Sequence, residues 1–170
     1  MDFQLLNNNS IRIKSKKASF VVDPVKEIGK TSADGVLSLS KGVIDVSRVA
    51  DSRIVISASG EYEVGGVKIS GFAVEQGISY SINADNIFVV LGKVSNLKEA
   101  QDKTFSCQIA LLNADEDPSA VVAKLEPKIV ILYGEKKSEG AKALGKDVSP
   151  VNKFSAKDSF PAEMEVIILG

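Results

Sequence analysis

The chain contains no histidine among its 170 residues, although histidine is the usual neutral zinc ligand and titrates closest to pH 7. The remaining candidates for metal chemistry are the oxygen donors Asn8, Asp23, Asp34 and Asp45. Such oxygens suit magnesium or calcium. Each carboxylate, however, stands where a strand end or a turn is expected, and capping a turn needs no metal. The sequence favours this structural role and leaves an oxygen-ligated metal as the alternative.

Hydroxyl and thiol nucleophiles are present, but no histidine exists to activate them. The candidate hydroxyls belong to Ser38, Ser40, Ser57 and Ser59. No motif supports a Ser–Lys pair with Lys41 or Lys93. Cys107 begins an apolar run, which predicts a buried and unreactive thiol. The glycines at 60, 65 and 66 lack the surrounding pattern of a phosphate-binding loop and are interpreted as turn residues.

Composition limits the class of protein. Hydrophobic residues make up 44% of the chain, enough for a sizeable core, and 21 basic and 22 acidic residues give a net charge of −1. This balance indicates binding to neither nucleic acid nor a membrane surface. The single cysteine fits a reducing compartment, and neither a signal sequence nor a membrane span is recognised. We expect one cytoplasmic domain over residues 1–170, without a cofactor, whose ligand or protein partner is unknown and whose homo-oligomeric state stays open.

The first half of the chain predicts an antiparallel meander. Short alternating or β-branched runs mark strands at 10–14, 18–22, 53–57, 61–64, 67–70, 77–82 and 86–91. Gly65 and Gly66 separate two of these runs, and a two-residue glycine turn is typical of a tight β-hairpin.

After Gly92 the pattern changes to a βαβ unit. The runs 107–112 and 128–133 are almost continuously apolar, as in strands buried on both faces. Between them, Asp117 and Pro118 predict a helix start and Pro127 predicts its end. A second helix is expected over 138–144, and strands over 151–156 and 164–169. The whole pattern predicts an α/β fold with two packed mixed sheets and helices outside.

Four local phrases carry a resemblance to a known family. The most specific is Gly60-Glu61-Tyr62-Glu63-Val64-Gly65-Gly66-Val67, and the others begin at Val21, Pro127 and Asp158. In this order they resemble the metallo-β-lactamase fold, in particular small metal-dependent hydrolases similar to ascorbate-6-phosphate lactonase. The resemblance implies a four-layer αββα sandwich, with two mixed sheets and short helices outside.

The same resemblance implies which positions would carry the metal ligands. They are occupied by Asn8, Ser40, Gly42, Ile44, Asp45, Lys93 and Gly134, with Asn96 near a further histidine position. A catalytic zinc needs about three strong protein donors, which these side chains do not supply. Lys93 places a cation where the resemblance implies a bridging aspartate, and would repel a divalent metal. No catalytic residue and no metal ligand is therefore expected.

Two functions remain open from the sequence. The first is a protein of this fold without zinc-hydrolase activity, a pseudoenzyme that acts as a binding or interaction module. The second is a metal-dependent hydrolase of the same superfamily with an atypical oxygen-ligand site. A different chain that completes a site is a third, weaker hypothesis. At the degenerate site we expect side chains to close over the space, or Lys93 to pair with Asp23 or Asp45.

Overall fold

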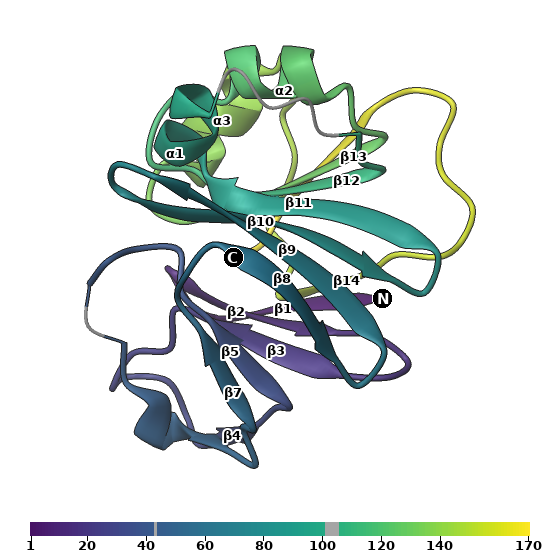
Figure 1. The fold of residues 1–170 in the computed structure, drawn as a ribbon. Helices are drawn as coiled ribbons and strands as arrows, with labels where there is room; N and C mark the ends of the chain where they lie inside the picture. Colours follow the sequence, from purple (N-terminus) through teal and green to yellow (C-terminus); the bar gives the residue numbers. More distant parts are fainter. Residues whose placement is uncertain (43, 101–105) are drawn as a thin grey trace.

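Two β-sheets packed face to face form the body of the molecule (Figure 1). The computed structural model describes residues 1–42, 44–100 and 106–170. The larger sheet has seven strands in the order β15-β13-β12-β11-β10-β9-β8. Their bounds are β8 Gly60–Val64, β9 Val67–Val74, β10 Gly77–Ala84, β11 Ile87–Lys93, β12 Ile109–Asn113, β13 Ile129–Tyr133 and β15 Glu165–Ile168. The sheet is mixed, because β8 to β11 are antiparallel whereas β11, β12, β13 and β15 are parallel.

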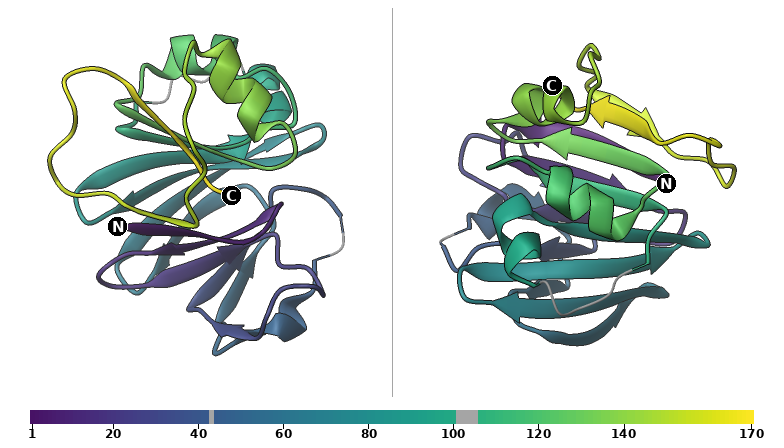
Figure 2. Two further views of the ribbon diagram at one scale, coloured as in Figure 1. Left: turned by 180° about the vertical axis from the view of Figure 1, so that it is seen from behind. Right: turned by 90° about the horizontal axis from the view of Figure 1, so that it is seen from above.

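The smaller sheet has six strands in the order β14-β1-β2-β3-β5-β7. Their bounds are β1 Asp2–Asn7, β2 Ser10–Lys14, β3 Ser19–Val22, β5 Gly35–Leu37, β7 Ile54–Ile56 and β14 Lys153–Ser155. This sheet is also mixed, with antiparallel pairing from β14 to β3 and parallel pairing from β3 to β7. Strand β14 lies beside β1, so segments from the two ends of the chain pair in one sheet (Figure 2).

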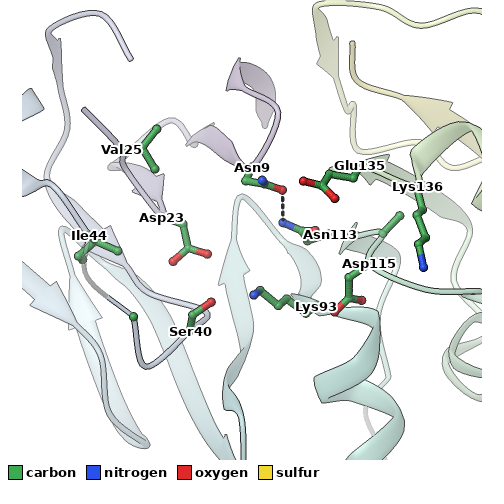
Figure 3. A pocket seen from close by; sticks show the side chains of 12 residues that line it. Asn9, Asp23, Val25, Ser40, Ile44, Lys93, Asn113, Asp115, Glu135 and Lys136 are labelled. Atoms are coloured by element: carbon green, nitrogen blue, oxygen red, sulfur yellow. Dashed lines mark hydrogen bonds between the residues drawn. The ribbon is translucent and has the colours of Figure 1, made fainter. Parts of the chain in front are cut away.

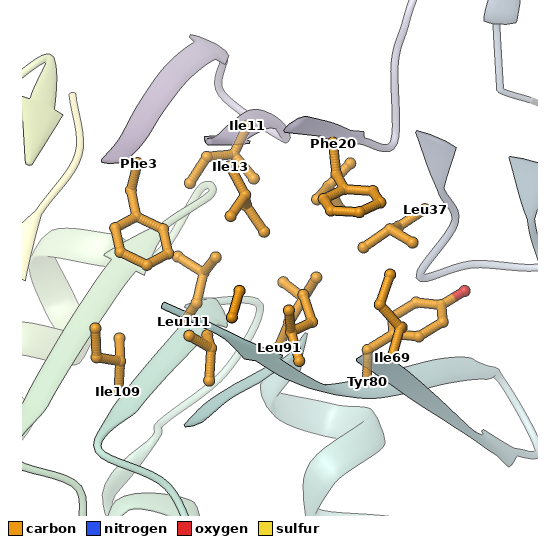
Figure 4. Packing of buried hydrophobic residues seen from close by; sticks show 14 of the residues in the cluster. Phe3, Ile11, Ile13, Phe20, Leu37, Ile69, Tyr80, Leu91, Ile109 and Leu111 are labelled. Carbon is orange, nitrogen blue, oxygen red and sulfur yellow. The ribbon is translucent and has the colours of Figure 1, made fainter. Parts of the chain in front are cut away.

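An apolar core fills the space between the sheets (Figure 4). Alternation along each strand decides which side chains enter it, because successive residues point to opposite faces. Ile11 and Ile13 of β2, for example, are both almost completely buried, and the charged Lys14 next to them is exposed. Large fully buried members from the two sheets are Phe3, Ile11, Ile13, Phe20, Leu37, Ile69, Tyr80 and Ile82.

The outer faces of the two sheets are covered differently. Helices α1 (Val94–Glu99), α2 (Ser119–Leu125) and α3 (Lys137–Ala143) lie over the larger sheet, where a second apolar cluster fills the contact (Figure 1). The outer face of the smaller sheet carries a third apolar cluster under loops, the 3₁₀ turn η1 (Val46–Arg48), and the two-stranded sheet β4–β6. β4 is Thr31–Ser32 and β6 is Val49–Ala50. Two packed mixed sheets with short helices outside are confirmed, although the described residues form no α-helix before Val94.

Several local predictions are confirmed. Strands β8 and β9 pair antiparallel across Gly65 and Gly66. Their φ angles of 57° and 79° are positive, and glycine adopts positive φ without the steric cost that a side chain brings. The α2 region differs by one residue, since Pro118 precedes the helix instead of opening it. The Asp117 carboxylate still accepts the Ser119 N–H, at 2.8 Å. Cys107 is buried, which raises the pKa of its thiol to about 11.

Several elements have no counterpart in the sequence prediction, and the two that bear on the site are strand β1 and helix α1. Both depend on distant partners: β1 pairs with β14, and the first turn of α1 is bound by the Asp115 carboxylate. In the described part of the chain, no helix has the length and apolar character needed to cross a membrane.

Candidate functional site

A cavity of about 400 Å³ opens at the carboxyl ends of strands from both sheets (Figure 3). Asp23 follows β3, Ser40 follows β5, Lys93 ends β11 and Asn113 ends β12. Carboxyl ends of parallel strands are where open α/β sheets place their ligands. The lining residues are Asn9, Asp23, Val25, Ser40, Gly42, Ile44, Lys93, Asn113, Ala114, Asp115, Glu135 and Lys136.

Asp23 is the most perturbed acid of the cavity. Its backbone takes φ 43°, which is unusual for a residue with a side chain, and its Oδ1 accepts the Leu39 N–H at 2.9 Å. Burial raises the pKa of this carboxyl to about 6, against smaller lowering effects from the Leu39 amide, the Lys93 charge and the Ser38 hydroxyl. An acid that titrates near neutral pH inside a cavity is typical of a functional site.

Lys93 supplies a positive charge opposite Asp23. Its side chain extends toward Asp23 and Ser40 (Figure 3), and its charge lowers the pKa of Asp23. Among the described ion pairs, however, none joins Lys93 to Asp23 or to Asp45. Asp45 instead accepts the Ser47 N–H and caps the 3₁₀ turn. The expectations that Lys93 forms such a pair, or that side chains fill this space, are therefore wrong.

The loop that carries Ser40 is fixed against β10. Ser40 forms an isolated antiparallel bridge with Gly77, and the Leu39 carbonyl accepts both the Ile78 N–H at 3.0 Å and Asn96 Nδ2 at 3.2 Å. A Cβ on Gly77 would lie 2.0 Å from the Leu39 oxygen. Only glycine allows this approach, so the rim of the cavity depends on a residue outside it.

The far side of the cavity is a network of amides and carboxylates. Asn113 Nδ2 donates to Asn9 Oδ1 at 3.3 Å across the two sheets (Figure 3). The Asp115 carboxylate accepts both the backbone N–H and the hydroxyl of Ser95, and so holds the first turn of α1. Glu135 is exposed at the rim. Tyr133 is fully buried beneath, and burial together with the charges of the nearby acids raises the pKa of its hydroxyl well above 10.

The structure gathers only some of the positions that the resemblance implies. Ser40, Gly42, Ile44 and Lys93 line the cavity, whereas Asn8, Asp45 and Gly134 do not. The residues next to them in the chain, Asn9, Ile44 and Glu135, line the cavity instead. Gly134 has φ 94°, and a Cβ there would lie 2.5 Å from Asn113 Oδ1, so no ligating side chain fits without rearrangement.

Sequence reasoning missed Asn9, Asn113, Asp115 and Glu135. Three of them follow the apolar β12 and β13 runs, and polar residues directly after buried parallel strands are the signal that would have found them. Asp23 was considered as an oxygen donor together with Asp34. Asp34 lies elsewhere, because its carboxylate accepts the Ser19 N–H and pairs with Arg53 at 2.8 Å.

The side chains of the cavity do not fit a catalytic zinc. Nowhere in the described ranges do three His, Cys, Asp or Glu side chains come together in a group that could hold a metal ion, and a zinc site needs about three such ligands. The carboxylate of Asp115 is already engaged by Ser95. Lys93 adds a positive charge that opposes a divalent cation.

No protein-family model matches the sequence, and no curated protein matches it. Solved structures do. A protein from Thermotoga maritima, assigned to the Zn-dependent hydrolases of the metallo-β-lactamase superfamily, superposes with a TM-score of 0.78 at 20% identity, covering 99% of this chain and 97% of that one. A protein from Parabacteroides distasonis, assigned as a metal-dependent hydrolase, superposes with a TM-score of 0.66 at 16% identity, covering 98% of this chain and 91% of that one. The chain therefore has the metallo-β-lactamase fold.

Proposed function

We propose that this protein is a metal-independent binding module with the metallo-β-lactamase fold, and that it lacks zinc-hydrolase activity. The observation that carries the proposal is the position of Lys93 opposite the partly buried Asp23, without a direct ion pair between them, in an open cavity at the strand ends. A cavity of this volume lies within the range of small-molecule sites. The ammonium of Lys93 stands where a metal-dependent enzyme of this fold would need negative or neutral donors.

Electrostatics explains why the cavity suits binding better than metal catalysis. A zinc-bound water becomes hydroxide near neutral pH only because the metal stabilises the negative charge. Without a fitting donor set, no residue of the cavity replaces that effect. Asp23 and Lys93 instead offer a hydrogen-bond-accepting group and a hydrogen-bond-donating group, which orient a ligand.

The alternative is a hydrolase with an oxygen-ligated metal, and one observation favours it. Three carboxylates, those of Asp23, Asp115 and Glu135, line the same cavity, and magnesium or manganese accepts such ligands. This alternative requires Asp115 to leave Ser95 and the metal to tolerate Lys93. The two functions predict opposite responses to added metal.

Metal titration separates the two functions. A ligand that binds only the native state raises stability, so the unfolding temperature of the wild-type protein should stay unchanged with zinc, manganese, magnesium or a chelator. The variant Lys93→Asp removes the cation and restores an acid, and is the variant expected to gain a metal response. Lys93→Met is the matched control that removes the charge alone.

Hydrolysis of lactone, β-lactam and phosphodiester substrates should not exceed the rate of a buffer control. Stoichiometric zinc in the pure protein, together with chelator-sensitive hydrolysis, would overturn the proposal. A stabilising response to magnesium or manganese that is lost in Asp23→Asn would establish the oxygen-ligand alternative instead.

A further inference from the structure

We infer that the cavity binds a neutral, hydroxyl-rich molecule of about monosaccharide size, one hydroxyl of which bridges Asp23 and Lys93. The inference rests on the proposed binding function and adds the class of ligand. It follows from the hydrogen-bonding capacity of the two side chains, the distribution of charge around the cavity, and the polar and apolar groups on its walls.

The Asp23 carboxylate and the Lys93 ammonium have complementary hydrogen-bonding capacities. An ionised carboxylate only accepts hydrogen bonds, and an ammonium only donates them. Both side chains face the same space (Figure 3), and the ion pairs of the described residues do not include a direct contact between them. A hydroxyl is the smallest ligand group that donates to the one and accepts from the other through a single oxygen.

The charges on the wall disfavour an ionic ligand of either sign. The lining carries the carboxylates of Asp23, Asp115 and Glu135 and the ammonium groups of Lys93 and Lys136. A ligand carboxylate or phosphate placed on Lys93 would meet the nearby carboxylates. A ligand cation placed on Asp23 would meet Lys93. Like charges brought together at a binding site reject the wrong ligand, whereas a neutral ligand meets neither penalty.

The rest of the wall offers groups that a polyol can use. Asn9 Oδ1 already accepts from Asn113, so the Asn9 amide keeps its own N–H groups for a ligand oxygen. Ser40 adds a hydroxyl, and Val25 and Ile44 form an apolar side for the carbon skeleton. The volume of about 400 Å³ is near the lower end of small-molecule sites, which limits the ligand to a small one.

The test compares three open-chain polyols that differ only at the terminal group: sorbitol, gluconate and glucamine. Chemical-shift titration of the amide spectrum reports both affinity and location. We expect sorbitol to bind with shifts concentrated around Asp23, Ser40 and Lys93, and both charged analogues to bind at least about fivefold more weakly. Tighter binding of gluconate or glucamine, or no binding of sorbitol, would overturn the inference.

Paired variants test the bridge itself. Asp23→Asn and Lys93→Met should each weaken sorbitol binding about tenfold. The matched controls Asp2→Asn and Lys153→Met disrupt an ion pair of 2.7 Å on the smaller sheet and should leave the affinity unchanged. Equal affinities in all four variants would refute the bridge, provided that their spectra show the native fold.

The inference and the proposed function fail in different ways. If a charged analogue binds in the cavity and sorbitol does not, the ligand class is wrong and the metal-independent binding function stands. If zinc binds stoichiometrically and supports hydrolysis, the proposed function is wrong whatever the polyols do.

Discussion

The core between the sheets and the cavity at their carboxyl ends are built by the same strands. In β11, Leu91 is fully buried in the core, and Lys93, two residues later on the same face, lines the cavity. In β12, the fully buried Leu111 is likewise followed two residues later by Asn113, which lines the cavity. The cavity is therefore the continuation of the inter-sheet space, at the point where the side chains become polar.

This change along each strand separates the residues that stabilise the fold from those of the proposed binding site. Apolar side chains buried in the core contribute roughly 1.5–3 kcal/mol each, whereas a buried polar group costs free energy unless it is hydrogen-bonded. Asp23, with its raised pKa, has such a cost in its charged form. A protein keeps groups of this kind where they bind or react, and the predictions below test that division.

The largest effect is expected in the core. Leu91→Ala removes a fully buried side chain and should lower the free energy of unfolding by about 4 kcal/mol. Lys93→Met, two residues along the same face, should change it by less than about 1 kcal/mol. Denaturant unfolding of both variants measures the contrast. Similar losses in the two would mean that the cavity and the core are not energetically distinct.

A close backbone approach should matter almost as much as the core. Gly77→Ala would place a Cβ 2.0 Å from the Leu39 oxygen and 2.8 Å from Asn96 Nδ2, which should cost about 3 kcal/mol. Gly29→Ala is the matched control, because nothing lies within 4 Å of a Cβ there. Denaturant midpoints compare the two variants, and equal midpoints would contradict the fixed position of the Ser40 loop.

The charge on Asp23 should make stability depend on pH in an uncommon direction. Its pKa is about 6 in the folded protein against an ordinary 3.8, so the folded state holds the proton more tightly than the unfolded chain. The contribution of Asp23 to the free energy of unfolding is therefore fully present below about pH 4 and is lost as pH rises through about 6. Asp23→Asn removes that loss, because asparagine keeps an oxygen for the Leu39 N–H and carries no charge.

Relative to the wild type, Asp23→Asn should gain about 2 to 3 kcal/mol of unfolding free energy between pH 4 and pH 8. Denaturant unfolding across this range measures the difference. Acids with lowered pKa values, such as Asp34, have the opposite dependence and cancel in the comparison. A difference that stays flat with pH would show that Asp23 is ionised without penalty.

The smallest effect compares two buried tyrosines. The Tyr80 hydroxyl lies 2.8 Å from the Ser38 oxygen and 2.9 Å from the Ile56 oxygen, so Tyr80→Phe should cost about 1 kcal/mol. The Tyr133 hydroxyl lies near Asn113 but has no partner with hydrogen-bond geometry among the described residues. Tyr133→Phe should therefore be neutral or stabilising. A larger loss for Tyr133 than for Tyr80 would reveal a hydrogen bond at the base of the cavity.

Local chemistry determined much of this fold. The Gly65-Gly66 turn, the alternation in β2 and the apolar runs that became β12 and β13 each have a cause within a few residues, since side-chain period and turn conformation are local properties. The same sequence also predicts, through its missing histidines and the lysine at position 93, that no zinc site forms.

Only the tertiary structure decided the rest. Helix α1 is six residues long with no side-chain cap of its own, and its first turn is held by Asp115, which is 20 residues away. Its formation therefore depends on a contact that no local pattern contains. Likewise, the raised pKa of Asp23 and the open space between Asp23 and Lys93 arise from packing between two sheets. Burial and distance between segments far apart in the chain are properties of the assembled fold, and a single sequence does not specify them locally.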